Sequence, residues 1–455
     1  MVTWGETVYI EDQEQAFFKA EDSCEEKLLA AVGILIVGLK ERPNKLVVVI
    51  NPVGGRKRAC KDFYKKVYPI FKRAWIHTKV IQTKYKGHGT HIIKEAASSG
   101  ELKDCDGIVA VGGDGLVSEI VTGLFVVAAD SQGLSHDDAE VDFPATQIRL
   151  GIIPCGSTDA TCFATHGSSD IVTAALHIVM ESYCIPTGDK RFVDVASIHA
   201  DGKLHRVVTT LISYGYFGDL MRSSEHLRCL GPPRYILSGV QQVLRNRSYP
   251  VDISFRKRKH FPDTETGSTE TDSTLQSTLS CSSICTVCSQ LDEDVDYGIS
   301  TEDDWQSVHG LYSIVSAAIT SCSCRLTPQG VSPLAHLGDG YCDLILVKGS
   351  SRVKLLSYLY HTSVTGNAAS LNHVRMIRTN EIKFSAPPDR LSSFNCDGEE
   401  LEKASLRIKI HRKKLELFCR GVEKKLLPSS PNVGRKFGRD SINLIGNGEN
   451  GMISC

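Results

Sequence analysis

The sequence predicts an α/β domain with a mostly parallel sheet, followed by a domain built from antiparallel β-strands. From Lys45 onward, apolar runs of strand length alternate with helical stretches. After about residue 190 the chain changes to short segments in which apolar and polar residues alternate. Strands that alternate with helices are typical of a right-handed parallel sheet. Alternation with a period of two is typical of antiparallel strands.

The first domain is expected to span residues 45–190. Its first strand, LVVVI (46–50), is wholly apolar and ends at an Asn-Pro turn, as a central parallel strand does. We expect further strands at 77–85, 107–111 and 150–154, with helices at 61–74, 90–99, 116–128 and 169–180. The turns after these strands should collect at one edge of the sheet, where parallel sheets bind ligands.

The second, β-rich domain is expected to span residues 191–427. Its strands are expected in RFVDVASIHA (191–200), HRVVTTLISYGYF (205–217), VDISF (251–255), GLYSIVSAAI (310–319), CDLILVKG (342–349), EIKFSA (381–386) and SLRIKIHRKKLELFCRG (405–421). The Ser/Thr/Asp/Glu-rich stretch 257–305 is poor in large apolar residues and predicts a mobile insertion. A short segment (1–44) precedes these domains, and the Ser/Asn/Gly-rich stretch 428–455 predicts a disordered tail.

Composition excludes several classes of function. Lys plus Arg (52) nearly balances Asp plus Glu (53), so no global charge attracts nucleic acid. The longest apolar run near the start, 28–39, is too short to cross a bilayer, and the acidic residues before it do not fit a signal peptide. Sixteen cysteines without a secretory signal indicate reduced thiols and a cytoplasmic protein.

One carboxylate lies in a glycine-rich turn between a buried strand and a helix. The turn is Gly112-Gly113-Asp114-Gly115, and the helix after it has apolar residues on one face at Val117, Ile120, Val121 and Leu124. Glycines let a phosphate approach the main chain, and a helix N-terminus favours an anion. Asp114 could instead be a helix cap worth about 1 kcal/mol, but a cap alone would not require three glycines.

Two further turns at predicted strand ends have similar chemistry. Asn51-Pro52-Val53-Gly54-Gly55 follows the first strand, and Gly156-Ser157-Thr158-Asp159 follows the fourth. Each alone is ordinary turn or capping chemistry, but three such turns after parallel strands should share one crevice. Neither a G-x-x-x-x-G-K-[ST] loop nor a G-x-G-x-x-G turn after the first strand is present, which disfavours a P-loop and a nicotinamide or flavin site.

The motifs NPVGG, VGGDGLVSEIVTGL and GIIPCGSTD, in this order, resemble those of the diacylglycerol-kinase catalytic family over roughly residues 45–425. The resemblance implies an α/β nucleotide-binding domain followed by a β-sandwich, and ATP-dependent phosphorylation of a lipid hydroxyl. The tracts 214–239, 327–347 and 395–411 are most similar to the ceramide kinase branch. Ceramide 1-phosphate is then the implied product. The alternatives are a sphingosine or diacylglycerol kinase, or a nonenzymatic lipid-binding protein of the ceramide kinase-like kind.

The same resemblance implies roles for individual residues. Asp114 is the implied proton acceptor for the lipid hydroxyl. The implied ATP-binding residues are Asn51, Pro52, Val53, Gly54, Gly55, Thr83, Lys84, Tyr85, Lys86, Gly87, Glu119, Gly156, Ser157, Thr158, Arg228, Arg234, Asp397, Gly398 and Glu399. The implied substrate-binding residues are Gly112, Gly113, Asp114, Gly115 and Asp219. Mg²⁺ is expected near Asp219, Asp397 and Glu399, because phosphoryl transfer uses carboxylate-held Mg²⁺.

Regulation and location are also expectations from the resemblance. Ca²⁺ stimulation and peripheral attachment to Golgi or plasma membrane are implied. Because only about 44 residues precede the first expected strand, we expect the N-terminal pleckstrin-homology domain of that branch to be truncated, missing or replaced. The stretch 353–364 matches a calmodulin target by position, but it is not convincingly basic, so a buried helix is favoured. Cys281, Cys285 and Cys288 could bind zinc, but zinc prefers four ligands, and only a distant His or Cys is available as the fourth. A redox-sensitive or membrane-facing cluster is the alternative.

Overall fold

The computed structural model describes residues 43–55, 57–180, 191–227, 230–231, 233–256, 281, 285, 288, 305–324, 327–349, 351–388 and 392–419. The expected N-terminal segment (to residue 42) and the expected C-terminal tail lie outside these residues, as does most of the insertion. Arg228 also lies outside them.

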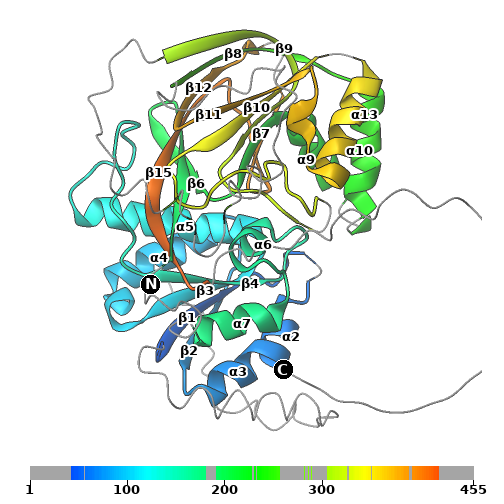
Figure 1. Ribbon diagram of the computed structural model, residues 1–455. Helices are drawn as coiled ribbons and strands as arrows, with labels where there is room; N and C mark the ends of the chain where they lie inside the picture. Colours follow the sequence, from blue (N-terminus) through cyan, green and yellow to red (C-terminus); the bar gives the residue numbers. More distant parts are fainter. Residues whose placement is uncertain are drawn as a thin grey trace, which may run out of the picture. The chain divides into compact units, whose positions relative to one another are not determined.

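Four parallel strands form the sheet of the first region (Figure 1). They are β1 (Lys45–Ile50), β2 (His77–Gln82), β3 (Gly107–Gly112) and β4 (Arg149–Pro154), in the order β4-β3-β1-β2. Val48 of the central strand β1 pairs with Val80 on one side and Val109 on the other. Strand β3 is buried along its whole length, which explains its wholly apolar sequence.

Helices pack on this sheet close to the four predicted stretches, although the stretch 61–74 forms three consecutive segments, and the helices Glu101–Asp104 and Ala160–His166 were not predicted. They are α2 (Ala59–Asp62), η1 (Phe63–Val67), α3 (Tyr68–Arg73), α4 (His88–Ser98), η2 (Glu101–Asp104), α5 (Asp114–Ser131), α6 (Ala160–His166) and α7 (Ile171–Val179). In Figure 1, α4 and α5 lie together on one side of the sheet, and α3 and α7 on the other. Helix α5 is longer than predicted, because it begins at Asp114 itself and continues to Ser131.

The second region is a set of mostly antiparallel strands. They are β5 (Arg191–Ala200), β6 (Lys203–Val208), β7 (Leu211–Gly215), β8 (Tyr249–Arg256), β9 (Trp305–Ala318), β10 (Cys342–Lys348), β11 (Val374–Thr379), β12 (Glu381–Ser385), β13 (Phe394–Cys396), β14 (Glu399–Leu401) and β15 (Ser405–Leu417). Strand β15 pairs antiparallel with β5 and β12, and its last residue, Leu417, pairs with Leu150 of β4. This one strand therefore connects both regions, and the predicted fold class is confirmed.

Helices interrupt the second region where the sequence analysis expected only strands. The stretch 205–217 is not one strand: β6 ends before Thr209, β7 ends at Gly215, and helix α9 (Tyr216–Glu225) follows. Gly215 has a φ of 84°, a left-handed value that lets the chain turn from strand to helix. Helix α10 (Pro233–Arg245) was not predicted either.

The helix predicted at 353–364 forms as α13 (Arg352–Tyr360) and η5 (His361–Thr365), followed by η6 (Ala368–Ser370). The expectation that it is buried is wrong for one face. Leu355 and Tyr358 are buried, but the side chains of Val353 and Leu356 are 75% and 51% exposed. Among the described residues, no helix combines the length and the hydropathy that crossing a membrane requires.

Candidate active site

The turns that follow β1, β3 and β4 pack against one another at one edge of the parallel sheet. A Cβ on Gly156 would lie 2.5 Å from the Cα of Gly113, and a Cβ on Gly55 would lie 2.3 Å from the carbonyl oxygen of Cys155. Gly55 also has a φ of 53°, a value that favours glycine. The glycines are therefore needed for this close backbone packing, and the three predicted turns form one surface.

Local hydrogen bonds hold the first and third turns open toward solvent. The side-chain oxygen of Asn51 accepts bonds of 3.1 Å from the amides of Val53 and Gly54, which fixes the turn after β1. In the turn after β4, Asp159 accepts a bond of 2.8 Å from the amide of Gly156. The side chains of Val53, Ser157 and Thr158 are exposed on this surface, while Pro52 is half-buried.

Asp114 begins helix α5, but its carboxylate faces helix α6. Its Oδ1 accepts a bond of 2.9 Å from the amide of Thr161, and its Oδ2 accepts one of 3.1 Å from the amide of Ala160. Burial raises the pKa of Asp114; the amide of Thr161 opposes this shift, and the nearby carboxyl of Asp397 adds to it. Asp114 is thus held in place by another helix, and its raised pKa suits a group that accepts a proton.

The predicted segment 83–87 forms the turn before α4 and is held by Glu119 of α5. The carboxylate of Glu119 accepts bonds of 2.7 Å from the amide of Gly87 and 2.9 Å from the amide of Gly89. The carboxylate of Glu119 therefore holds the turn to helix α5 through these two charge-assisted hydrogen bonds.

Side chains of this turn lie at the surface. The Nζ of Lys86 forms an ion pair of 2.7 Å with Glu399 of β14. Lys84 is exposed, and its amide donates to the ring of His88 at 3.0 Å. The ring of Tyr85, which is 54% exposed, stacks on the same His88 with centroids 4.5 Å apart. Thr83 is bound to the end of β1, because its amide donates to the carbonyl of Ile50 at 2.9 Å.

Asp397 and Gly398 form the two-residue loop of the β13–β14 hairpin, since Cys396 pairs with Glu399. Asp397 and Gly398 have φ values of 50° and 85°, as the Asp-Gly loops of tight hairpins do. The buried carboxylate of Asp397 accepts five hydrogen bonds, from the amides of Thr209, Thr210 and Leu211 and from both threonine hydroxyls. Asp397 is therefore an anchor that joins the hairpin to the start of β7.

The hairpin also reaches the Asp114 turn. A Cβ on Gly115 would lie 2.9 Å from Oε1 of Glu399, so the carboxylate of Glu399 lies against the beginning of α5. The hydroxyls of Thr161 and Thr209 are 3.1 Å apart, and they connect the partners of Asp114 with the partners of Asp397. The hairpin residues and the GGDG turn thus meet, although they lie at opposite ends of the sequence.

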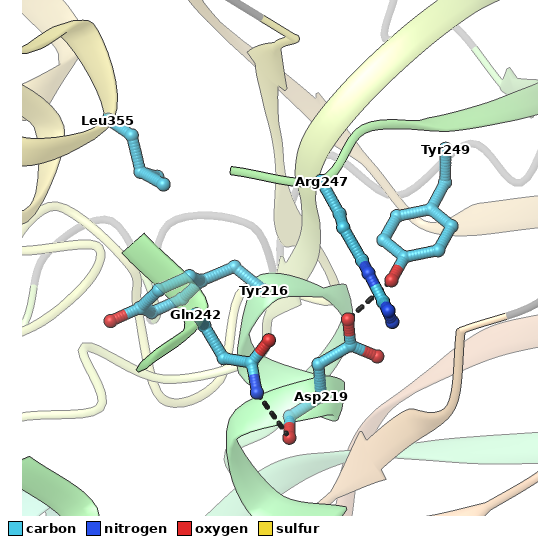
Figure 2. A pocket seen from close by; sticks show the side chains of 6 residues that line it. All are labelled: Tyr216, Asp219, Gln242, Arg247, Tyr249 and Leu355. Atoms are coloured by element: carbon cyan, nitrogen blue, oxygen red, sulfur yellow. Dashed lines mark hydrogen bonds between the residues drawn. The ribbon is translucent and has the colours of Figure 1, made fainter. Parts of the chain in front are cut away.

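Asp219 lies in a small pocket of the second region (Figure 2). The pocket is lined by Tyr216, Asp219, Gln242, Arg247, Tyr249 and Leu355. The buried carboxylate of Asp219 accepts a bond from the hydroxyl of Tyr249 and one of 2.6 Å from the hydroxyl of Ser392. Burial, with Asp219 close by, raises the pKa of Tyr249 to about 12, so its phenol remains a proton donor.

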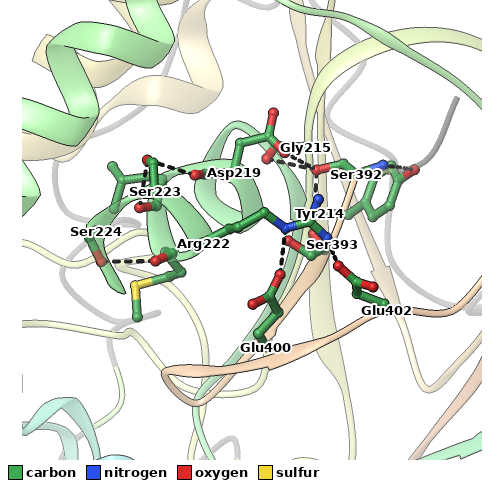
Figure 3. A network of polar contacts seen from close by, with 12 residues as sticks. Tyr214, Gly215, Asp219, Arg222, Ser223, Ser224, Ser392, Ser393, Glu400 and Glu402 are labelled. Carbon is green, nitrogen blue, oxygen red and sulfur yellow. Dashed lines mark hydrogen bonds and ion pairs between the residues drawn. The ribbon is translucent and has the colours of Figure 1, made fainter. Parts of the chain in front are cut away.

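Sequence reasoning missed Ser392, Tyr249 and Arg222, because their partners are distant in the chain. Ser392 is 173 positions from Asp219, so no local motif links the two residues. Arg222 of α9 pairs with Glu400 at 2.6 Å and with Glu402 (Figure 3). The one available local signal is the strand-glycine-helix transition before Asp219.

The structure describes two further groups of predicted site residues. Asp219, Asp397 and Glu399 do not come together: among the described residues, they do not form a group whose oxygen atoms could hold one metal ion. The carboxylate of Asp219 accepts bonds from two hydroxyls, that of Asp397 accepts five hydrogen bonds, and Lys86 pairs with Glu399. Arg234 lies near Tyr235 and Glu225, with its Nη2 2.7 Å from the Tyr235 hydroxyl, so its described contacts belong to α9 and α10.

Two family models match the chain. The diacylglycerol kinase catalytic domain matches residues 45–184, and the YegS C-terminal NAD kinase beta sandwich-like domain matches residues 293–419. The first match contains the three strand-end turns. The second contains β9 to β15 and therefore the hairpin at Asp397.

Known proteins resemble the chain over most of its length. A human ceramide kinase is 32% identical over 431 residues, which cover 86% of this chain and 76% of that protein. A human ceramide kinase-like protein is 26% identical over 402 residues, which cover 82% of this chain and 64% of that protein. The fold resembles the crystal structure of a Bacillus anthracis protein assigned to the diacylglycerol kinases, with a TM-score of 0.54, 18% identity, and coverage of 84% of this chain and 97% of that one. The chain therefore belongs to the ceramide kinase group of the diacylglycerol kinase family, and it is a lipid kinase.

Proposed function

We propose that this lipid kinase transfers the γ-phosphoryl group of ATP to the primary hydroxyl of ceramide and forms ceramide 1-phosphate. The observation that carries the proposal is the environment of Asp114, a carboxylate with a raised pKa beside three converging glycine turns. Phosphoryl transfer depends chiefly on positioning and on neutralising charge. A positioned proton acceptor contributes about 10²–10⁴-fold in rate.

The surface of the three turns supports binding of the ATP phosphates. Gly113 and Gly156 are half-buried and let the turns after β3 and β4 pack closely, and the exposed side chains of Ser157 and Thr158 follow Gly156. The N-terminus of α5 offers free amides and the positive end of a helix dipole. Lys86 adds a cation at the edge of this surface. Mg²⁺ enters the proposal only as the counter-ion that arrives with ATP.

In the proposed step, Asp114 accepts the proton of the lipid hydroxyl. The hydroxyl oxygen forms a bond to the γ-phosphorus, the bond from that phosphorus to the bridging oxygen breaks, and ADP leaves. The amides of Ala160 and Thr161 fix the carboxylate before the lipid arrives, so little rearrangement is needed during the step.

The pocket around Asp219 supports a substrate with several polar groups near its reacting hydroxyl. Asp219, Gln242 and Arg247 offer acceptors and donors together in this pocket. Ceramide carries two hydroxyls and an amide, whereas diacylglycerol carries one hydroxyl and two esters. Among the alternative substrates, sphingosine fits this pocket best, because it differs from ceramide near the reacting hydroxyl by an amine in place of the amide. A nonenzymatic lipid-binding protein is disfavoured by the intact Asn51 turn.

Helices α10 and α13–η5 support peripheral contact with a membrane on the cytoplasmic side, at the Golgi or the plasma membrane. They contact each other, and their exposed apolar side chains recur at helical spacing in what we call the helix-pair surface: Ile236, Leu237, Val240, Leu244, Val353, Leu356, Tyr360 and Val364. Residues 233–247 and 351–365 contain four arginines and one lysine but no acidic residue. Apolar side chains with cations around them suit an anionic lipid surface.

A panel of lipids tests the proposed activity. Transfer from labelled ATP to ceramide, sphingosine and diacylglycerol should be fastest with ceramide, and Asp114→Asn should give the background. Transfer chiefly to sphingosine or diacylglycerol would preserve the mechanism and overturn the substrate. Lipid binding without transfer to any of the three would contradict the proposed kinase reaction.

Vesicles test the proposed membrane contact. The double variant Leu244→Glu and Val353→Glu should bind phosphatidylserine-containing vesicles about tenfold or more weakly, because each change replaces apolar contact with a repelled charge. Leu134→Glu, at an exposed leucine of the first region, is the matched control and should bind as the wild type does. Unchanged vesicle binding by the double variant, or Ca²⁺–calmodulin binding to this surface in its place, would contradict the assignment.

A further inference from the structure

A cluster of three cysteines and one histidine contains none of the residues of the candidate active site. The Sγ atoms of Cys281, Cys285 and Cys288 and a ring nitrogen of His336 all lie within 4.8 Å of one another. The cysteines come from the chain between β8 and β9, and His336 comes from the connection between β9 and β10. The fold thus brings a fourth ligand to the C-x3-C-x2-C motif.

The separations within the cluster fit one tetrahedral ion. Nδ1 of His336 lies 3.3 Å from the Sγ of Cys285 and 3.8 Å from the Sγ of Cys288, and the Sγ atoms of Cys281 and Cys288 are 4.0 Å apart. Zinc bonds of about 2.3 Å to sulfur and about 2.0 Å to nitrogen give tetrahedral edges of roughly 3.5–3.8 Å. The sulfur pair is much too far apart for a disulfide, whose bond is about 2.05 Å long.

Surrounding groups fix the orientation of these ligands. The amide of Leu337 donates to the Sγ of Cys281 at 3.4 Å, as main-chain donors do toward metal-bound thiolates. The guanidinium of Arg412, on β15, donates to the carbonyl of Cys288 at 3.2 Å. The amide of Asp194, on β5, donates to the carbonyl of Leu337 at 2.7 Å. His336 itself is buried, and the three cysteines are half-buried.

We propose that Cys281, Cys285, Cys288 and His336 bind one structural zinc ion. Thiolate and imidazole ligands select zinc over the hard cations Mg²⁺ and Ca²⁺. Four protein ligands leave no open position for a substrate, so the ion has a structural role. Three thiolates exceed the charge of Zn²⁺ by one unit, and the nearby cationic Arg412 lowers the cost of that excess.

The position of the cluster indicates what the zinc stabilises. Cys281 packs against the core that contains the parallel sheet. Through Leu337 and Arg412, the cluster is also attached to β5 and β15, and β15 is the strand that joins the two regions. Zinc would therefore hold the inserted segment and the β9–β10 connection against the junction of both regions.

Metal analysis of the untagged wild-type chain, purified from zinc-supplemented medium, tests the proposal directly. We expect about one zinc per chain, as in other sites with four protein ligands. Chain in which Co²⁺ replaces zinc should show sulfur-to-cobalt charge transfer and the strong visible bands of tetrahedral coordination. A chain that contains less than about a tenth of an equivalent, and that gives no such bands with Co²⁺, would overturn the site.

Variants test the identity of the fourth ligand. His336→Ala should lose the zinc, whereas His336→Cys should retain it, because four cysteines also form a zinc site. Cys60→Ser is the matched control at a half-buried cysteine of α2 and should keep the metal. Should His336→Ala fail to fold, removal of zinc from the wild type by a chelator should lower its Tm, and added zinc should restore it. Full zinc retention by His336→Ala, or an unchanged Tm of the wild type after zinc is removed, would contradict the assignment.

Discussion

Asp114 and Asp397 lie in different regions of the molecule and are connected by the hydroxyls of Thr161 and Thr209. Asp114 receives two hydrogen bonds from main-chain amides at the start of α6, and the side chain of Thr161 also interacts with its carboxylate. Asp397 receives five, from the turn that precedes β7. The two carboxylates are therefore chemically alike but differ in how many of their lone pairs are occupied.

This difference separates a proton acceptor from an anchor. A carboxylate has about four acceptor positions, so Asp397 has none left for a ligand, whereas Asp114 keeps capacity for an incoming hydroxyl. The hairpin that contains Asp397 also contains a third carboxylate, that of Glu399, which lies against Gly115 and pairs with Lys86. In this hairpin, Asp397 thus stabilises the fold, whereas Glu399 lies at the edge of the candidate site.

The largest expected effect on stability comes from Asp397→Ala. The change leaves three amides and two hydroxyls in a buried turn without their acceptor, and it places alanine at a left-handed φ of 50°. We expect the free energy of unfolding to fall by about 3 kcal/mol or more. Denaturant titration measures it. The control Asp252→Ala, at an exposed acid of β8, should change it by less than about 1 kcal/mol, and equal losses in the two variants would show that Asp397 is no anchor.

Gly156→Ala should damage the strand-end region rather than the hairpin. The Cβ of alanine at this position would lie 2.5 Å from the Cα of Gly113, so two backbones must separate where ATP is proposed to bind. We expect kcat/KM for ATP to fall about tenfold or more, since small misplacements of reacting groups are costly. Gly202→Ala is the control: Gly202 has open space around it, so the added methyl group meets no neighbour, and although its φ of 70° makes alanine strained there, kcat/KM for ATP should stay unchanged because Gly202 lies outside the strand-end turns. A normal kcat/KM in Gly156→Ala would contradict the proposed phosphate surface.

The pH dependence should reflect the raised pKa of Asp114. The base form of Asp114 is lost as pH falls through its raised pKa, which lies above the ordinary carboxyl pKa of about 3.9. Below the raised pKa, kcat/KM for the lipid should decline about tenfold per pH unit. The stability of the fold changes with pH in the opposite sense. The contribution of Asp114 to the free energy of unfolding is complete below the ordinary carboxyl pKa and is lost as pH rises through the raised pKa of the folded state. Rates that stay constant to the ordinary carboxyl pKa would contradict this assignment.

Lys86→Ala should have the smallest effect. Its ion pair with Glu399 joins the two regions, but the lysine side chain is 67% exposed. Solvent and salt screen such a pair, so we expect less than about 1 kcal/mol of stability to be lost. KM for ATP should rise about two- to fivefold through loss of a cation near the phosphates. Glu399→Gln separates the two roles: it breaks the same pair but should not raise KM.

The parallel region was predictable because its signals are local. Apolar runs such as 46–50 and 107–111, each followed by a glycine turn, locate both the strands and the site edge. The second region was predicted less well. Helix α9 begins within a run of apolar and aromatic residues that also suits a strand, and only the left-handed Gly215 divides the two.

Long-range contacts explain the remaining errors in the candidate site. A metal site at Asp219, Asp397 and Glu399 required two distant segments, α9 and the β13–β14 hairpin, to point their carboxylates at one place. Hydrogen bonds with Tyr249 and with residues 209–211 direct Asp219 and Asp397 elsewhere. The same limit concealed His336, which lies 48 positions after Cys288.

The most direct test of the account combines kinetics and binding in Asp114→Asn. Asparagine keeps an oxygen acceptor for α6 and removes the group that takes the proton. Transfer from ATP to ceramide should fall about 10²–10⁴-fold, while ATP affinity and Tm, measured in the same samples, stay close to the wild-type values. Transfer within about tenfold of the wild-type rate would contradict Asp114 as the proton acceptor.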